Sequence, residues 1–178
     1  MLIQVTNITI HLKMHFSDTF PTMPIKHLRR GCFVTRSKTS TCYPLIINAR
    51  RGYIENFHQY FFNLPPDNDY IKWTVGKAMY MADGTALKQK QALDENGFYS
   101  DIISSSAVCT IICDSIQFDE HTRKFSYYGT QIIKRRTRDL KRTMLTTGYV
   151  ENVPRTQNNP HGLMITNWRT LENKDLDY

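Results

Sequence analysis

The feature that most constrains the fold of this sequence is a change of hydrophobic period near residue 106. From about residue 46 to this point, apolar side chains recur every three or four residues, the spacing that one face of a helix requires. After it, β-branched and aromatic residues alternate with polar ones, which is typical of strands. Because helical segments come first and strands follow, we expect an α+β domain with the helices packed on one face of an antiparallel sheet.

Four helical segments follow from the first pattern. Pro65 and Pro66 end the first segment, and Asp67 or Asp69 can cap the second. An Asp-Gly pair at 83–84 ends the second segment, and the third segment has the weakest pattern. The expected helices span about 46–63, 67–82, 86–93 and 98–105.

Four strands follow from the second pattern. The short links between them favour an antiparallel meander, in which each strand pairs with the next. On the first strand, an uninterrupted alternation would place every second residue from Val108 to Phe118 on one face of the sheet. The expected strands span about 108–118, 125–136, 141–150 and 163–171.

The positive charge of the chain is concentrated near its N-terminus. The formal net charge is +7. Residues 1–51 hold this whole excess, and residues 52–178 sum to zero. Residues 1–45 also contain prolines and a polar run, so we expect a basic, irregular segment that is disordered or foreign to a domain at residues 46–178. No run of about 18 apolar residues predicts a membrane-spanning helix, and no secretory signal is visible.

Patterns that carry catalytic or metal chemistry are sparse. Cys109 and Cys113 lie four residues apart on one strand, a distance of roughly 13 Å that is too long for a disulfide. A zinc site would need further ligands, and no His or Cys pair follows them at a suitable spacing. We therefore expect a buried structural pair, no metal and no cofactor. Asp114 or Tyr127 could act as a general base or a hydrogen-bond donor in a pocket beneath the sheet. For both residues, however, a structural role is the interpretation that we favour.

A basic run surrounds the turn between the second and third strands. Such a run can contact phosphate groups, and it can also protect an edge strand from aggregation. Stacking aromatic residues are not interleaved through it, as a platform for single-stranded nucleic acid would require. The candidate phosphate-contacting residues are Lys134, Arg135, Arg136 and Arg138, with Lys141 and Arg142 completing the run and Arg29 and Arg30 adding charge near the N-terminus.

Aromatic residues crowd the first predicted helix. There are more of them than one buried stripe requires, which indicates that this helix also meets a partner or a second subunit. Core packing alone is the alternative. The residues concerned are Tyr53, Phe57, Tyr60, Phe61 and Phe62.

A series of short motifs gives the chain a resemblance to one protein family. The motifs are FHQYFFNL at 57–64, PD at 66–67, KAMYMAD at 77–83, GFY at 97–99, CDSI at 113–116, YGTQ at 128–131, VPRTQNNPHG at 153–162 and NKD at 173–175. In their order and spacing, they resemble the TraK proteins of Bacteroides-type conjugative transposons. None of the motifs is a catalytic signature.

TraK proteins resemble the small bitopic inner-membrane assembly factor of type IV secretion systems. The resemblance implies a cytoplasmic tail, one membrane helix and a periplasmic domain. It also implies a nuclear-transport-factor-like or cystatin-like α+β fold, with helices on a strongly curved four-stranded antiparallel sheet. The segment from Asn159 to Gly162 looks like the family's Asn-Pro-x-Gly segment, which helps to shape self-association and contacts to other channel components.

The backbone preferences of Pro160 and Gly162 indicate a turn in this segment. Pro160 has a fixed φ, and Gly162 can adopt a positive φ, so the pair would set a rigid turn before the last strand. A turn with no binding role is the alternative. The expected contact residues for partners or self-association are Phe57, Tyr60, Phe61, Asn159, Pro160, His161 and Gly162.

These observations together predict a non-enzymatic structural component of a conjugative type IV secretion system. It would act as a scaffold for protein–protein contacts. The expected partners are further copies of the chain, in a dimer or higher oligomer, and other channel components, with DNA less favoured. The resemblance implies the bacterial inner membrane as its location, with the domain in the periplasm. The alternative is a nucleic-acid-binding accessory protein of the transfer machinery that uses the basic segments.

Overall fold

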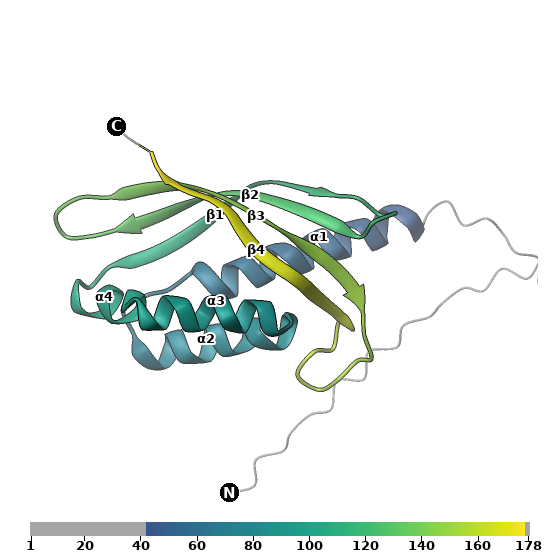
Figure 1. Cartoon of the computed structure of the whole chain (residues 1–178), viewed down its shortest axis with the longest axis horizontal. Coiled ribbons are helices and arrows are strands. Elements are labelled where there is room, and N and C mark those ends of the chain that lie inside the picture. The colour runs from purple at the N-terminus through teal and green to yellow at the C-terminus, as the bar shows by residue number, and fades with distance from the viewer. Residues whose placement is uncertain (1–41, 177–178) are drawn as a thin grey trace, which may run out of the picture. The chain divides into compact units, whose positions relative to one another are not determined.

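The computed structural model describes residues 42–176, which form four α-helices followed by four β-strands (Figure 1). The predicted α+β class and the predicted order of elements are confirmed. All four of these helices lie on one face of the sheet (Figure 1). The helices are α1 (Cys42–Phe62), α2 (Asn68–Met81), α3 (Gly84–Glu95) and α4 (Phe98–Ser104). The strands are β1 (Val108–Phe118), β2 (Lys124–Lys134), β3 (Leu140–Asn152) and β4 (Leu163–Asp175).

The first helix begins earlier than predicted. α1 starts at Cys42 and has Pro44 in its first turn. A proline is tolerated there because the N–H groups of the first turn have no partner within the helix. Of the segment predicted to be irregular, residues 42–45 belong to α1, and residues 1–41 lie outside the described part of the chain. None of the helices within residues 42–176 combines the length and apolar character needed to cross a membrane.

The described strands form a single antiparallel sheet in the order β1-β2-β3-β4, which confirms the predicted meander. The strong curvature that the family resemblance implied is not observed. Bulges bend a sheet locally, and here register shifts occur only once between β1 and β2 and twice between β3 and β4. β2 and β3 pair without interruption. The sheet is therefore twisted but not strongly curled.

The bulge in β1 overturns a prediction about the faces of this strand. The register shifts around Asp114, which has no partner on β2. Beyond it, Ile116 and Phe118 pack against the core. Before it, Val108 and Ile112 are exposed. The single face predicted for alternate residues from Val108 to Phe118 was wrong because a bulge inserts one residue and reverses the alternation after it.

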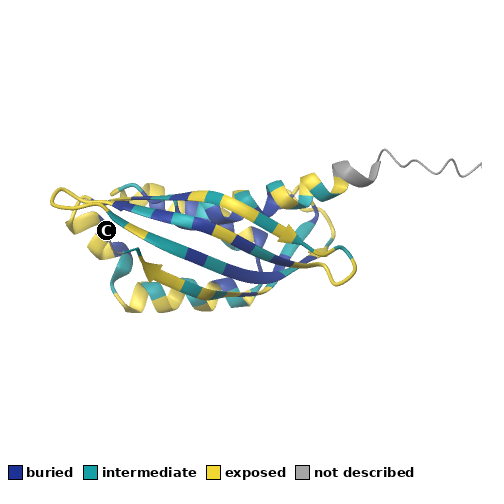
Figure 2. Ribbon diagram, turned by 90° about the horizontal axis from the view of Figure 1, so that it is seen from above, coloured by how far each residue is buried: buried dark blue, intermediate teal, exposed yellow. Residues whose placement is uncertain are grey.

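The main core lies between the sheet and α1. Figure 2, which looks onto the sheet, shows buried residues alternating with more exposed ones along the strands. Trp168 of β4 packs edge-on against Phe57 and Phe61, with ring centroids 5.0 and 4.9 Å apart. Each such pair contributes about 0.5–1.5 kcal/mol beyond its buried area. Core packing thus accounts for most of the aromatic surplus on α1, since the buried members are Tyr53, Phe57, Phe61 and Phe62.

The corner between α2 and α3 is attached to β4. Ala82 forms a bridge with Ile165, and the Asp83 N–H donates to the Ile165 carbonyl at 2.9 Å. The Asp83 carboxylate caps α3 by accepting from the Thr85 N–H at 2.9 Å, and it also accepts from the Asn167 N–H at 3.0 Å. These bonds hold the C-terminal end of α2 beside the first residues of β4, next to the loop that precedes this strand.

Candidate functional site

A groove runs between α2 and the loop that joins β3 to β4. We call it the aromatic groove, and its volume is about 550 Å³. Its two walls are distant in sequence. They come together because the corner between α2 and α3 is attached to β4, which brings α2 next to this loop. The lining residues are Tyr60 of α1, then Lys72, Trp73, Gly76, Lys77, Tyr80 and Met81 of α2, and Gln157, Asn158, Asn159, Pro160 and His161 of the loop.

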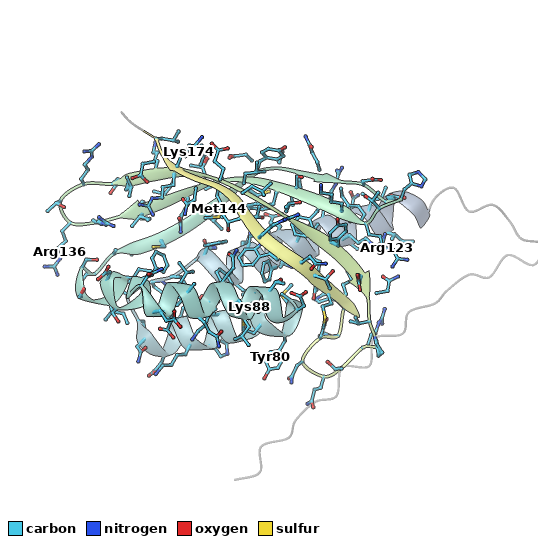
Figure 3. The ribbon with its side chains drawn as sticks, viewed as in Figure 1. Tyr80, Lys88, Arg123, Arg136, Met144 and Lys174 are labelled. Atoms are coloured by element: carbon cyan, nitrogen blue, oxygen red, sulfur yellow. The ribbon has the colours of Figure 1, made fainter. Side chains whose placement is uncertain are left out.

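The α2 wall of the groove presents two exposed aromatic rings. Trp73 and Tyr80 are each 54% exposed, and Figure 3 shows Tyr80 pointing away from the sheet. Lys77 lies over the Trp73 ring, with its Nζ atom 3.9 Å from the ring centroid. Such a cation–π contact contributes about 0.5–1 kcal/mol at an exposed site, enough to bias the orientation of the ring. These side chains face outward because the apolar stripe of α2 is buried on the other side.

The opposite wall is a loop whose backbone is closed by hydrogen bonds. Thr156 and Asn159 exchange backbone hydrogen bonds of 3.1 Å each. The Val153 N–H donates to the Gly162 carbonyl at 3.0 Å. Gly162 has a φ of 66°, in the left-handed region that favours glycine. The loop is therefore a defined turn that depends on the positive φ anticipated for Gly162.

Asn159 joins this loop to α2. Its buried side-chain amide donates to the carbonyl of Tyr80 at 3.3 Å and to that of Leu163 at 2.6 Å. Tyr53 of α1 reaches the same place, with its hydroxyl 3.1 Å from the Met81 carbonyl oxygen. Burial raises the pKa of Tyr53 to about 12, against a smaller lowering by its hydrogen bond with Asn159. The phenol therefore stays protonated at neutral pH and ties α1 to α2 beneath the groove.

The structure divides the predicted contact residues into two groups. Phe57 and Phe61 are 0% and 1% exposed, so their side chains belong to the core and cannot touch a partner in this structure. The physical reason is that α1 turns this stripe toward Trp168. The aromatic groove, in contrast, brings together Tyr60, Asn159, Pro160 and His161, and Gly162 shapes the loop beside them.

The α2 wall of the groove was not predicted from the sequence. Trp73, Lys77 and Tyr80 lie at positions i, i+4 and i+7 of the helix, on the side opposite its apolar stripe. Two aromatic residues on the polar side of an amphipathic helix were the signal in the sequence that could have indicated a contact surface there. Which face of α2 meets the β3–β4 loop could not be read from that spacing.

The candidate phosphate-contacting residues lie elsewhere. Lys134, Arg135, Arg136 and Arg138 are all exposed at the β2–β3 hairpin, which we call the basic tip. Arg142 differs, since it is paired with Asp175. The basic tip and the β3–β4 loop lie at opposite ends of the sheet (Figure 1), and Arg136 and Tyr80 mark the two regions in Figure 3.

The proposed pocket beneath the sheet is not present at the residues considered for it. Tyr127 is buried, and the His58 ring stacks on it with centroids 3.7 Å apart. Asp114 is exposed in the β1 bulge and accepts a hydrogen bond from Thr130 at 2.9 Å. The two therefore do not share a cavity. Within residues 42–176, no three His, Cys, Asp or Glu side chains gather as metal ligands would.

Cys109 and Cys113 behave as core residues. Cys109 is buried and Cys113 is partly buried. Burial raises the pKa of the Cys109 thiol to about 11, against a smaller lowering by nearby Arg135 and Arg142. A thiol that keeps its proton at neutral pH is a poor nucleophile and a poor metal ligand.

No protein-family model matches the sequence, and no curated protein matches it either. Several solved structures, however, are similar to the described part of the chain. The soluble domain of TrwG from the type IV secretion machinery of Bartonella grahamii is 16% identical, with a TM-score of 0.59 over 75% of this chain and 97% of that one. VirB8 of Agrobacterium tumefaciens is 11% identical, with a TM-score of 0.60 over 74% of this chain and 94% of that one.

A third similar structure is CagV, a VirB8 homologue of the type IV secretion system of Helicobacter pylori. It is 14% identical, with a TM-score of 0.55 over 71% of this chain and 99% of that one. Nearly the whole of each neighbour is matched, so the likeness extends over the complete domain. The described part of this chain therefore has the fold of VirB8-type proteins of type IV secretion systems.

Proposed function

We propose that the protein is a non-enzymatic structural component of a type IV secretion system that carries out conjugative DNA transfer. Its domain would stand in the periplasm as part of an inner-membrane assembly and would bind further copies of itself and other channel proteins. The shared fold with TrwG and VirB8 supports the secretion role. The TraK-like motifs support the conjugative setting.

The observation that carries the scaffold role is the convergence at the aromatic groove. Tyr60 and the loop from Asn159 to His161 were singled out separately in the sequence, and they line one groove together. Trp73 and Tyr80 add exposed rings to the same groove. Large exposed aromatic residues in a concave surface are typical of the anchors of protein interfaces.

The first test removes these two rings. We expect a Trp73→Ala/Tyr80→Ala variant to stay folded, because both side chains are more than half exposed. We expect the dissociation constant of self-association to rise by about 30-fold or more, the effect of losing one interface anchor worth about 2 kcal/mol. Sedimentation velocity of the full chain over a range of concentrations measures this constant.

The matched control is Leu171→Ala, which removes an apolar side chain that is 57% exposed on β4 and does not line the groove. It should leave self-association unchanged. A wild-type chain that stays monomeric at high concentration, or a double variant that associates like the wild type, would refute self-assembly through the groove.

A second candidate function is nucleic-acid binding by an accessory protein of the transfer machinery. The basic tip favours it, because Lys134, Arg135, Arg136 and Arg138 are exposed and no acidic partner is found for them among the described residues. Guanidinium groups suit phosphate recognition. The basic residues of the N-terminal third would add to the attraction.

The test of this candidate is the salt dependence of binding to a labelled single-stranded oligonucleotide. Each phosphate contact adds about 0.7 to the slope of log K against log salt, so Arg135→Gln/Arg136→Gln/Arg138→Gln should lower the slope by about 2. Fluorescence anisotropy measures it. The control variant Lys88→Gln/Lys124→Gln/Arg169→Gln removes the same charge from other exposed sites. Equal slopes for the two variants would eliminate the basic tip as the contact surface.

A further inference from the structure

The side of α2 that faces away from the core carries a pattern of its own. Tyr70, Trp73, Lys77 and Tyr80 follow one another at steps of three, four and three residues, the a and d spacing of a helix that pairs with another helix. We call these four residues the α2 stripe. Tyr70 is 46% exposed, and the other three side chains are exposed as well. The spacing thus predicts a helical partner for a face that lies in solvent.

The α2 stripe is continuous, because its members contact one another. The rings of Tyr70 and Trp73 have their centroids 5.7 Å apart. The Nζ atom of Lys77 lies between the rings of Trp73 and Tyr60, 3.9 and 5.7 Å from their centroids. In Figure 1, α2 is the helix farthest from the sheet. An aromatic surface at the outside of a domain is typical of a contact with another chain.

The stripe is complementary to itself in one orientation. In a two-fold interface, each residue contacts in the second copy the residue that contacts it in return. A two-fold axis at the level of residue 75 would place Tyr70 opposite Tyr80 of the second copy, and Trp73 opposite Lys77 of the second copy. A parallel pair would instead bring two Lys77 side chains together, and like charges repel. The order of residues in the stripe therefore favours an antiparallel pair, in which each cation meets a ring.

The aromatic groove favours the same arrangement. Its α2 wall runs from Lys72 to Met81, along the C-terminal part of the stripe, and does not include Tyr70. In the antiparallel pair, Tyr70 of each copy would lie beside Tyr80 at the groove of the other. Lys72 and Lys77 bring positive charge to that groove, and the face of an aromatic ring is negative. Each groove would thus receive a ring from the second copy.

We propose that the protein forms a two-fold symmetric dimer in which the α2 stripes of two copies pack antiparallel. Trp73 of each copy would contact Lys77 of the other, and Tyr70 of each would enter the aromatic groove of the other. This inference rests on the self-association proposed above and adds the orientation and register of the contact. A two-fold interface is closed, so the contact would produce a dimer and no filament.

The register is tested by placing the photo-crosslinking residue p-benzoyl-phenylalanine at position 70 of the full chain. After irradiation, we expect a covalent dimer in which mass spectrometry finds position 70 linked to the segment around Tyr80. Within one copy these positions are about 15 Å apart along α2, so the link must join two copies. The control carries the same residue in place of Tyr128, an exposed tyrosine of β2, and should give no covalent dimer.

A second measurement tests the contact between Trp73 and Lys77. Lys77→Glu should raise the dissociation constant of the dimer by about 10-fold or more, because two cation–π contacts are replaced by carboxylates against negative ring faces. Lys77→Arg should change it by less than about 3-fold, since a guanidinium group also stacks on aromatic rings. Lys88→Glu is the matched control, with the same change of charge at an exposed site of α3, and should behave like Lys77→Arg. Sedimentation velocity measures all three variants.

The outcomes separate this inference from the self-association on which it rests. A wild-type chain that stays monomeric would refute both. If the wild type associates, and Trp73→Ala/Tyr80→Ala weakens it, a link from position 70 to any segment other than that around Tyr80 overturns the antiparallel dimer alone. A link between the two positions 70 would indicate the parallel pair.

Two further results would also overturn the dimer proposed here. One is an equal effect of Lys77→Glu and Lys88→Glu on the dissociation constant. The other applies if the photo-crosslinking residue at position 70 prevents association: the residue is then placed at position 80, and the absence of a link to the segment around Tyr70 contradicts the proposed register.

Discussion

At pH 5 the protein is expected to be about 2 kcal/mol less stable toward unfolding than at pH 7, because His58 is buried in its neutral form. His58 is 0% exposed. Its Nδ1 atom lies 2.7 Å from the Ile54 carbonyl oxygen, and its Nε2 atom lies 2.7 Å from the Thr146 hydroxyl. With one ring proton, Nδ1 donates to the carbonyl and Nε2 accepts from the hydroxyl, so both ring nitrogens are satisfied without a charge.

The direction of the effect follows from the two pKa values of His58. Burial lowers the pKa in the folded protein to about 3, against a smaller raising by the hydrogen bond to Ile54. The unfolded chain takes up its proton near pH 6.5. The contribution of His58 is therefore fully present above about pH 6.5 and is lost by about 1.4 kcal/mol per pH unit as the pH falls toward 3.

Urea unfolding at pH 7, 6 and 5 measures this loss. A His58→Gln variant is the control. It should be less stable than the wild type at pH 7, because it disturbs a filled core, but its stability should change little between pH 7 and pH 5. Carboxylates such as Asp83 should contribute only below about pH 4. A wild type without this slope, or a His58→Gln variant with the same slope, would show that another group is responsible.

Two glycine-to-alanine changes are expected to act in opposite directions. Gly162→Ala should lower the free energy of unfolding by about 2 kcal/mol, because its φ of 66° disfavours any side chain. A Cβ atom there would also lie 2.8 Å from Arg155 Cγ and 3.0 Å from the Val153 carbonyl oxygen. Gly76→Ala should raise stability by about 0.5–1 kcal/mol, since Gly76 is inside α2 and a Cβ there meets no atom within 4 Å.

Thermal or urea unfolding of the two variants, followed by sedimentation of each under conditions where it is folded, tests the loop and its proposed role together. A bulkier change, Gly162→Leu, should also weaken self-association, because the loop forms one wall of the aromatic groove. Normal self-association of a folded Gly162→Leu variant would remove the loop from the proposed contact surface. A cost below about 0.5 kcal/mol for Gly162→Ala would show that the loop relaxes around the new side chain.

Local signals in the sequence determined most of the fold. Pro65 and Pro66 end α1, and Asp67 caps α2 by accepting from the Tyr70 N–H at 2.8 Å. These features act within a few residues, so they can be recognised without a structure. The order of helices and strands, and the meander with its short links, followed in the same way. The positive φ of Gly162 was anticipated for the same reason, because it concerns one residue and its nearest neighbours.

The candidate site could be only half predicted. Tyr60 and the Asn159–His161 segment were expected at a contact surface, but their meeting with Trp73 and Tyr80 depends on the corner at Asp83, which joins elements more than 80 positions apart in the chain. The burial of Phe57 and Phe61 was likewise decided by Trp168 on the last strand. No periodicity within one helix reveals which of its two aromatic faces a distant strand will cover.

The α+β class, the helices and strands, and the turns that separate them could all be predicted, because they depend on backbone preferences and on hydrophobic period. Other features came only from tertiary packing. The bulge at Asp114 reversed the faces of β1, the neutral state of His58 arose from complete burial, and the hydroxyl of Tyr99 was buried without a hydrogen-bond partner among the described residues. Each of these results from packing between segments far apart in the chain, where the neighbours of a side chain are set by the whole fold.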